Sequence, residues 1–260
     1  ARERGLKVDM AGFEVAMNAQ RDRGRAAARF SASLGQRVHT KGRVEFLGYA
    51  GTEDSGAVQA LFDAEGRETA VLRAGDAGVL VLDRTPFYAE SGGQVGDTGV
   101  LAAAGIRFVV EDTQGSGDQH LHIGRLESGE LRAGQRLDAT VDAERRRRIR
   151  LNHSATHLMH AALRKVLGGH VQQKGSLVTA ERTRFDFSHP QPVTADELAR
   201  IEAEVNFEIQ RNSAVDVELL GYQEAIGRGA MALFGEKYGD QVRVLTMGEG
   251  YSVELCGGTH

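Results

Sequence analysis

The sequence predicts an α+β fold built from three parts. These are an N-terminal helical arm at 1–37, a small β-barrel subdomain at 38–144 and an α/β domain at 145–260. Three patterns support this division. Apolar residues near the start have helical spacing, short β-rich runs between glycine-bearing turns fill the middle, and helical and strand patterns alternate thereafter.

The composition is that of an ordinary globular protein, since 41% of the 260 residues are hydrophobic and 26% are charged. No stretch approaches the ~18 consecutive apolar residues of a membrane span, and no apolar segment of a signal peptide follows the first residues. The single cysteine fits a reducing compartment. We therefore expect a cytoplasmic protein with no membrane partner. The net charge of −4 argues against a uniformly basic surface but is compatible with a local basic patch.

The first part carries apolar residues at helical intervals, followed by a charged stretch from Arg21 to Arg29. The apolar positions are Leu6, Met10, Phe13 and Met17. Such a segment is too short to be a domain, so we expect an arm or a linker.

The middle part contains β-rich runs at 43–47, 58–62, 78–82, 106–111, 121–126 and 137–141. Their spacing favours an all-β barrel or sandwich. The segment from Thr85 to Gln94 interrupts them with turn-forming residues. His120 and His122 share one face of a strand, and with no other ligand nearby we interpret them as structural or solvent-facing.

The last part begins with a helix predicted at 152–167 and two strands around 171–187. A second helix begins at the capping box of Thr194 and Glu197. Its apolar positions Leu198, Ile201, Val205 and Ile209 are expected to face inward. Strands around 214–220 and 241–255 flank a glycine-rich helical turn.

Two pairs of metal-ligand residues occur at i, i+4 spacing: His153 with His157, and Cys256 with His260. On a helix that spacing puts both imidazoles on one face. Imidazole and thiolate donors suit zinc, and four of them complete a tetrahedral shell. The alternatives are a hydrogen-bonded histidine pair with a buried cysteine, and nucleophilic catalysis by Cys256. We do not count His160 among the candidate metal ligands, because four better-spaced side chains already complete the shell.

The densest basic run is Arg145 to Arg148, followed by Arg150. Such runs are usually solvated helix surface. Because this one adjoins the first histidine of the candidate metal site, phosphate contact is an alternative, with Lys174 and Lys237 as lesser candidates. We select Arg147, Arg148 and Arg150 from this run, together with Lys174, as candidate residues for binding the phosphates of a nucleic acid.

Several motifs, taken in order, resemble the bacterial alanyl-tRNA synthetases. They are Thr85–Gly96, Asn152–Leu158, His170–Ser176, Arg184–Phe187, Gly235–Asp240 and Glu254–His260. The resemblance covers almost everything from about residue 38 onward. Free-standing proteins that edit mischarged alanine tRNA share the barrel and the metal-ligand motifs. The N-terminal arm resembles the synthetase segment that joins the tRNA-binding region to the editing domain, so we favour a synthetase fragment.

This resemblance implies a hydrolase domain that proofreads alanine tRNA. Alanine differs from glycine by one methyl group and from serine by one hydroxyl, so the aminoacylation pocket needs a second sieve. The implied reaction is hydrolysis of the ester that joins serine or glycine to the terminal adenosine of tRNA(Ala). The implied partner is the acceptor end of tRNA(Ala), and no protein partner is evident. ATP and Mg²⁺ would serve only the aminoacylation core, which this chain lacks.

The resemblance also assigns residues. The implied Zn²⁺ ligands are His153, His157, Cys256 and His260. Thr156 and Gln173 match the family's catalytic or substrate-contacting positions, and Gly92, Gly93 and Gln94 match a loop that leans from the barrel over the substrate pocket.

Four protein ligands are typical of a closed structural zinc, whereas hydrolytic zinc usually keeps a position open for water. The metal could therefore position the substrate without activating water. Two alternative functions stay open: a free-standing trans-editing enzyme, and a tRNA-binding module without catalysis in this truncated form.

Overall fold

The computed structural model describes residues 9–10, 12–18, 38, 42–232 and 239–260. Within the predicted arm, residues 12–18 are helical, and Met10 and Phe13 are exposed. Leu6, the charged stretch Arg21–Arg29 and Lys237 lie outside the described residues.

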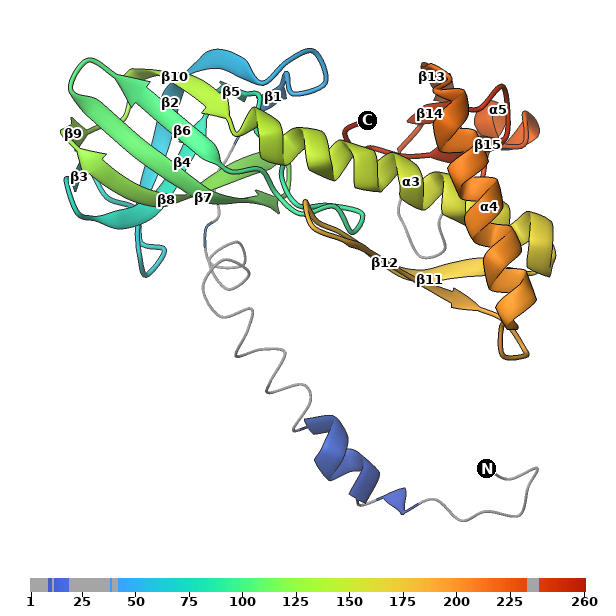
Figure 1. Ribbon diagram of the computed structural model, residues 1–260. Helices are drawn as coiled ribbons and strands as arrows, with labels where there is room; N and C mark the ends of the chain where they lie inside the picture. The colour runs from blue at the N-terminus through green and yellow to red at the C-terminus, as the bar shows by residue number, and fades with distance from the viewer. Residues whose placement is uncertain (1–8, 11, 19–37, 39–41, 233–238) are drawn as a thin grey trace.

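Six antiparallel strands form a closed barrel in the order β10-β2-β4-β8-β7-β6 (Figure 1). They are β2 (Glu53–Asp63), β4 (Ala77–Leu82), β6 (Gly99–Ala103), β7 (Ile106–Ser116), β8 (Gln119–Ser128) and β10 (Arg136–Val141). The predicted barrel is therefore confirmed. Strand β6 was not predicted, because its five residues begin with a glycine, include two alanines and show no clear alternation.

Alternating burial along the strands fills the barrel with apolar side chains. In β10, Leu137, Ala139 and Val141 are buried and the residues between them are exposed. They pack with Phe87 and Phe108, both fully buried, in one apolar cluster. Four two-residue strands complete this part: β1 (Glu45–Phe46), which pairs with β5 (Arg84–Thr85), and β3 (Leu72–Arg73), which pairs with β9 (Glu130–Leu131).

The long helix α3 (Ala143–Leu167) follows β10 directly and extends from the barrel into the second half of the molecule (Figure 1). It begins nine residues before the predicted start at 152, because Asp142 caps it by accepting a hydrogen bond from the Arg145 amide. The basic run is therefore part of this helix. His153 and His157 therefore lie on a helix that starts at the barrel.

A buried ion pair fixes the start of α3 to the barrel. The side chains of Arg146 and Asp97 are 3% and 1% exposed, and the guanidinium also donates to the carbonyls of Gly48 and Pro86, both at 2.8 Å. Asp97 in turn accepts from the Tyr88 amide. Arg146 is therefore a structural residue and not a solvated one, since its donors join three segments of backbone.

The second half contains β11 (Gln172–Val178), β12 (Thr183–Ser188), α4 (Ala195–Arg211), β13 (Val215–Gly221), α5 (Tyr222–Gly227), β14 (Gln241–Met247) and β15 (Ser252–Leu255). Strands β11 and β12 form a hairpin, and β13, β14 and β15 form an antiparallel sheet. Helices α3 and α4 pack together around Ala162, Leu163 and Ile201. The mixed helix-and-strand content of this half is as predicted, whereas the domain boundaries stay a prediction.

Helix α4 begins at the predicted capping box, in which Thr194 and Glu197 exchange side-chain and backbone hydrogen bonds. The expectation that Leu198 and Ile209 face inward is wrong, since they are 55% and 49% exposed. Only Ile201 and, in part, Val205 pack against the core, because α4 lies at the edge of this half and buries a narrow stripe.

The turn-rich segment that follows Thr85 reaches from the barrel to β11. The Val178 amide donates to the carbonyl of Gly93 at 2.7 Å, and the Val95 amide donates to the carbonyl of Val178 at 3.1 Å. Gly93 has φ +87°, and a Cβ there would lie 2.6 Å from the Ser176 carbonyl oxygen, so only glycine allows this approach. Among the helices of the described segments, none has the length and apolar character needed to span a membrane.

Candidate metal centre and its cleft

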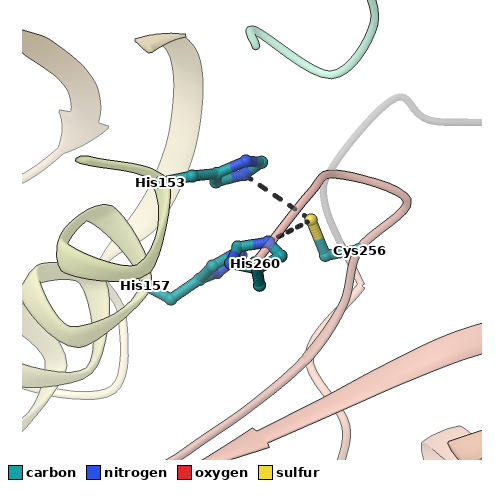
Figure 2. Close-up of side chains that lie close together, drawn as sticks. All are labelled: His153, His157, Cys256 and His260. Atoms are coloured by element: carbon teal, nitrogen blue, oxygen red, sulfur yellow. Dashed lines mark hydrogen bonds between the residues drawn. The ribbon is translucent and has the colours of Figure 1, made fainter. Parts of the chain in front are cut away.

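The four predicted metal ligands come together in the structure. His153 and His157 project from α3, and Cys256 and His260 lie on the segment that follows β15 (Figure 2). Their ligand atoms all lie within 4.8 Å of one another. Among the described residues, this is the one group of three or more such side chains arranged to hold a metal ion.

The distances within this cluster are compatible with zinc. Sγ of Cys256 lies 3.5 Å from Nε2 of His153 and 3.4 Å from Nε2 of His260. A tetrahedral shell with Zn–N of about 2.05 Å and Zn–S of about 2.3 Å separates those atoms by roughly 3.6 Å. Nε2 of His157 is buried and has no hydrogen-bond partner. A buried polar atom without a partner is costly, and a bound cation would satisfy this one.

Each histidine of the cluster is oriented through its other ring nitrogen. Nδ1 of His153 lies 2.8 Å from Oε1 of Gln94, and Nδ1 of His157 lies 2.8 Å from the Glu254 carboxylate. Nδ1 of His260 lies 3.1 Å from the Ser154 hydroxyl. Partners of this kind fix the ring and its tautomer, which leaves Nε2 as the ligand atom.

The electrostatics of the cluster also suit a cation. Burial alone would raise the pKa of the Cys256 thiol, but the three neighbouring imidazoles of His153, His157 and His260 hold this pKa well below its usual value. Burial alone would lower the pKa of His157, but Glu254 and Cys256 raise it, to about 10. A thiolate and a carboxylate thus supply negative charge, and the proton on His157 is one that a bound metal would displace.

Three of the four residues, His153, His157 and Cys256, line a cleft of about 470 Å³ between the barrel and the second half. This volume falls within the ~300–1,000 Å³ range of small-molecule sites. The barrel side is lined by Phe46, Tyr49, Tyr88 and His120, and the opposite side by residues of α3, β11, β12 and the segment after β15. A small substrate placed here would therefore touch both halves of the chain.

Both predicted catalytic residues line this cleft. Thr156, which is 4% exposed, donates from its hydroxyl to the Asn152 carbonyl at 2.8 Å and lies 2.6 Å from the Thr183 hydroxyl. Gln173 lies in β11 beside a β-bulge, where Lys174 is the extra residue. The bulge re-aims the neighbouring side chains of that strand.

The predicted loop residues occupy three different environments. Gly92 lines the cleft, Gly93 contacts β11, and Gln94 is completely buried. The Gln94 side chain accepts from His153 and from the Thr259 amide at 3.0 Å, and its Nε2 donates to the Thr259 hydroxyl at 2.9 Å. Gln94 thus ties the barrel to a helix histidine and to the last turn of the chain.

The candidate tRNA-binding residues do not line this cleft. Arg147 and Arg148 are exposed and form ion pairs with Glu144 at 3.0 Å. Arg150 donates to the His260 carbonyl, and Nζ of Lys174 lies 3.3 Å from Oε1 of Gln172. They stay candidates on the outer surface.

Sequence reasoning missed several residues that build the site. Glu254 bonds His157 and also His160, whose Nδ1 lies 3.1 Å from Oε1. Thr183 contacts the Thr156 hydroxyl, and Arg243 donates to the carbonyl of Gly258 at 2.8 Å. Only Glu254 had a usable signal, since it lies two residues before Cys256 at the end of the strand predicted around 241–255, where alternation would direct it toward the cysteine's face.

The chain is similar to known proteins along its whole length. The model of the family described as tRNA synthetases class II (A) matches residues 1–145. The chain is 55% identical over 260 residues to a protein of Halorhodospira halophila (strain DSM 244 / SL1) named Alanine--tRNA ligase. It is 54% identical over 264 residues to one of the same name from Stenotrophomonas maltophilia (strain K279a). Each match covers 100% of this chain and 30% of the relative, so the chain spans less than a third of their length.

Proposed function

Because the chain belongs to the class II (A) tRNA synthetase family, we propose that it is the part of an alanine–tRNA ligase that removes wrongly attached amino acids. The proposed reaction is hydrolysis of the aminoacyl ester of Ser-tRNA(Ala) and Gly-tRNA(Ala). The observation that carries this proposal is that the metal-ligand cluster opens onto the same cleft as Thr156 and Gln173. The cytoplasm, where tRNA is charged, is the proposed location.

The metal ligands would be His153, His157, Cys256 and His260. Bound Zn²⁺ would supply a Lewis acid that polarises the ester carbonyl and fixes its position. The chain's own residues prepare the site for this. Nδ1 of His153 donates its proton to the Gln94 oxygen, and Nδ1 of His157 donates its proton to the Glu254 carboxylate. Nε2 of each ring is then free to offer a lone pair to the metal.

Thr156 supplies a means of distinguishing serine from alanine. Its single hydroxyl proton goes to the Asn152 carbonyl, so the Thr183 hydroxyl is the donor in the contact between the two threonines. One lone pair of the Thr156 oxygen then remains to accept a hydrogen bond. The side-chain hydroxyl of serine can donate to it, whereas the methyl group of alanine cannot. This contact explains how the site distinguishes serine from alanine. It does not explain how the site would recognise glycine.

The test is deacylation of Ser-tRNA(Ala) beside Ala-tRNA(Ala) by the 260-residue chain, with the metal content of the same sample measured. We expect selective release of serine and about one zinc per chain. The Cys256→Ala variant should lose zinc and deacylation together. A zinc-loaded chain that releases no serine would contradict the proposal.

A second candidate is a tRNA-binding module without catalysis. The observation that favours it is the set of four protein ligands, which is typical of closed structural zinc. Under this alternative, the zinc-loaded chain would bind tRNA(Ala) in a filter-binding assay and leave Ser-tRNA(Ala) intact.

A further inference from the structure

Four aromatic side chains gather on the barrel side of the cleft, at a place that neither the metal cluster nor Thr156 explains. We call Phe46, Tyr49, Tyr88 and His120 the aromatic wall; all four line the cleft. The Phe46 ring lies at its centre, with ring centroids 4.8 Å from Tyr49, 5.3 Å from His120 and 6.0 Å from Tyr88. A wall of this kind offers a surface on which a planar base can stack.

His120 presents one defined polar group in this wall. Its Nδ1 lies 2.8 Å from the carbonyl oxygen of Phe87, which only accepts, so Nδ1 carries the ring proton. Burial lowers the pKa of His120, which favours the neutral ring. Nε2 is then a hydrogen-bond acceptor, and no described residue donates to it. The wall therefore complements a flat ligand with an exocyclic N–H donor.

The aromatic wall adjoins the metal cluster. The Tyr49 hydroxyl donates to the carbonyl of Gly257 at 2.6 Å, one residue after Cys256. The guanidinium of Arg243 lies 4.3 Å over the Tyr49 ring and also donates to the carbonyl of Gly258. A ligand whose reactive end lies at the cluster can thus extend onto the wall without leaving the cleft.

We propose that the aromatic wall binds the base of the terminal adenosine of the tRNA, with Nε2 of His120 accepting a hydrogen bond from the exocyclic amino group of adenine. This proposal rests on the editing function, since that function brings an aminoacyl-adenosine into the cleft. Hypoxanthine carries a carbonyl oxygen where adenine carries the amino group. That oxygen would face the lone pair of His120, so the subsite selects adenine over hypoxanthine.

The test measures binding of AMP and IMP to the zinc-loaded 260-residue chain by NMR titration. For the unmodified chain we expect AMP to bind about tenfold more tightly than IMP, the effect of one hydrogen bond. Phe46→Leu should weaken both ligands about fivefold or more, through lost stacking. His120→Phe keeps a ring but removes the acceptor, so it should abolish the difference between AMP and IMP. His189→Phe, outside the cleft, is the matched control and should behave as the unmodified chain.

The proposal is overturned if the unmodified chain binds AMP and IMP equally, or binds neither at millimolar concentration. It is also overturned if folded Phe46→Leu binds both nucleotides as tightly as the unmodified chain, or if folded His120→Phe still prefers AMP to IMP. Comparison of the two nucleotides on the unmodified chain needs no variant, so a misfolded variant cannot hide the answer. Deacylation separates the two proposals: serine release without nucleotide selectivity rejects the subsite alone, and selectivity without serine release rejects the editing function alone.

Discussion

Nδ1 of His153, on helix α3, lies 2.8 Å from the side-chain oxygen of Gln94, which belongs to a loop of the barrel. The two residues are 59 positions apart in sequence. The same oxygen accepts from the Thr259 amide, next to the ligand His260. The side-chain amide of Gln94 thus orients His153 on the helix. It also holds the segment that carries the candidate ligands Cys256 and His260.

Replacing Gln94 by leucine should therefore weaken metal binding without removing a ligand. The substitution leaves Nδ1 of His153 and the Thr259 amide without acceptors in a buried place. Loss of such a ligand partner typically costs ~10–100-fold in metal affinity. Competition with a chromophoric chelator measures it. Gln172→Leu, at an exposed position of β11, is the control. An unchanged zinc affinity in folded Gln94→Leu would contradict this orienting role.

The Thr156→Val substitution tests the acceptor that we assign to serine recognition. Valine has the shape of threonine without the hydroxyl, so the zinc content should be unchanged and kcat/KM for Ser-tRNA(Ala) should fall about tenfold, the effect of one hydrogen bond. Thr183→Val is the matched control. It removes a donor to the Thr156 oxygen but leaves that oxygen able to accept, so the preference for serine over alanine should persist. Equal effects of the two variants would disprove the assignment.

Arg146→Met should destabilise the molecule strongly. Asp97 would be left charged and 1% exposed, without the guanidinium that now bonds it. Breaking such a buried pair from one side costs ~3–5 kcal/mol in the free energy of unfolding. Urea denaturation measures this loss. Arg147→Met is the control, because Arg147 forms an exposed ion pair that solvent screens, so its loss should change the free energy of unfolding little. Similar losses in both variants would show that the Arg146 pair is not essential.

Local signals explain which features the sequence could predict. The capping box of Thr194 and Glu197, the alternation in β10 and the i, i+4 spacing of His153 and His157 each lie within one element. The early start of α3 also had a local signal in Asp142, but the run of arginines hid the apolar period there.

Long-range contacts explain what the sequence could not predict. Glu254 meets His160 across 94 positions, and Tyr49 reaches Gly257 across 208. No spacing rule connects such residues, because folding alone brings their elements together. The exposure of Leu198 on α4 has a similar origin, since helical periodicity identifies an apolar face and does not say how much of it a neighbour covers.

The barrel should lose stability as the pH falls from about 6.5 toward 3. His122 is fully buried, its Nδ1 donates to the Leu80 carbonyl and its Nε2 accepts from the Thr85 hydroxyl. Burial lowers its pKa to about 3, against 6.5 for the ordinary side chain. Between these values the unfolded chain binds a proton that the folded chain does not, so the free energy of unfolding rises with pH there and levels off above about 6.5.

At pH 5 this linkage should cost the folded chain about 2 kcal/mol relative to pH 7.5. His122→Gln removes the titrating ring and keeps an amide in its place, so it should reduce the loss between these two pH values even if it lowers stability at both. Urea denaturation of both proteins at pH 7.5 and pH 5 tests this. Carboxylates elsewhere titrate equally in the two proteins and cancel in the comparison. An identical pH dependence in both proteins would mean that His122 already binds its proton in the folded barrel.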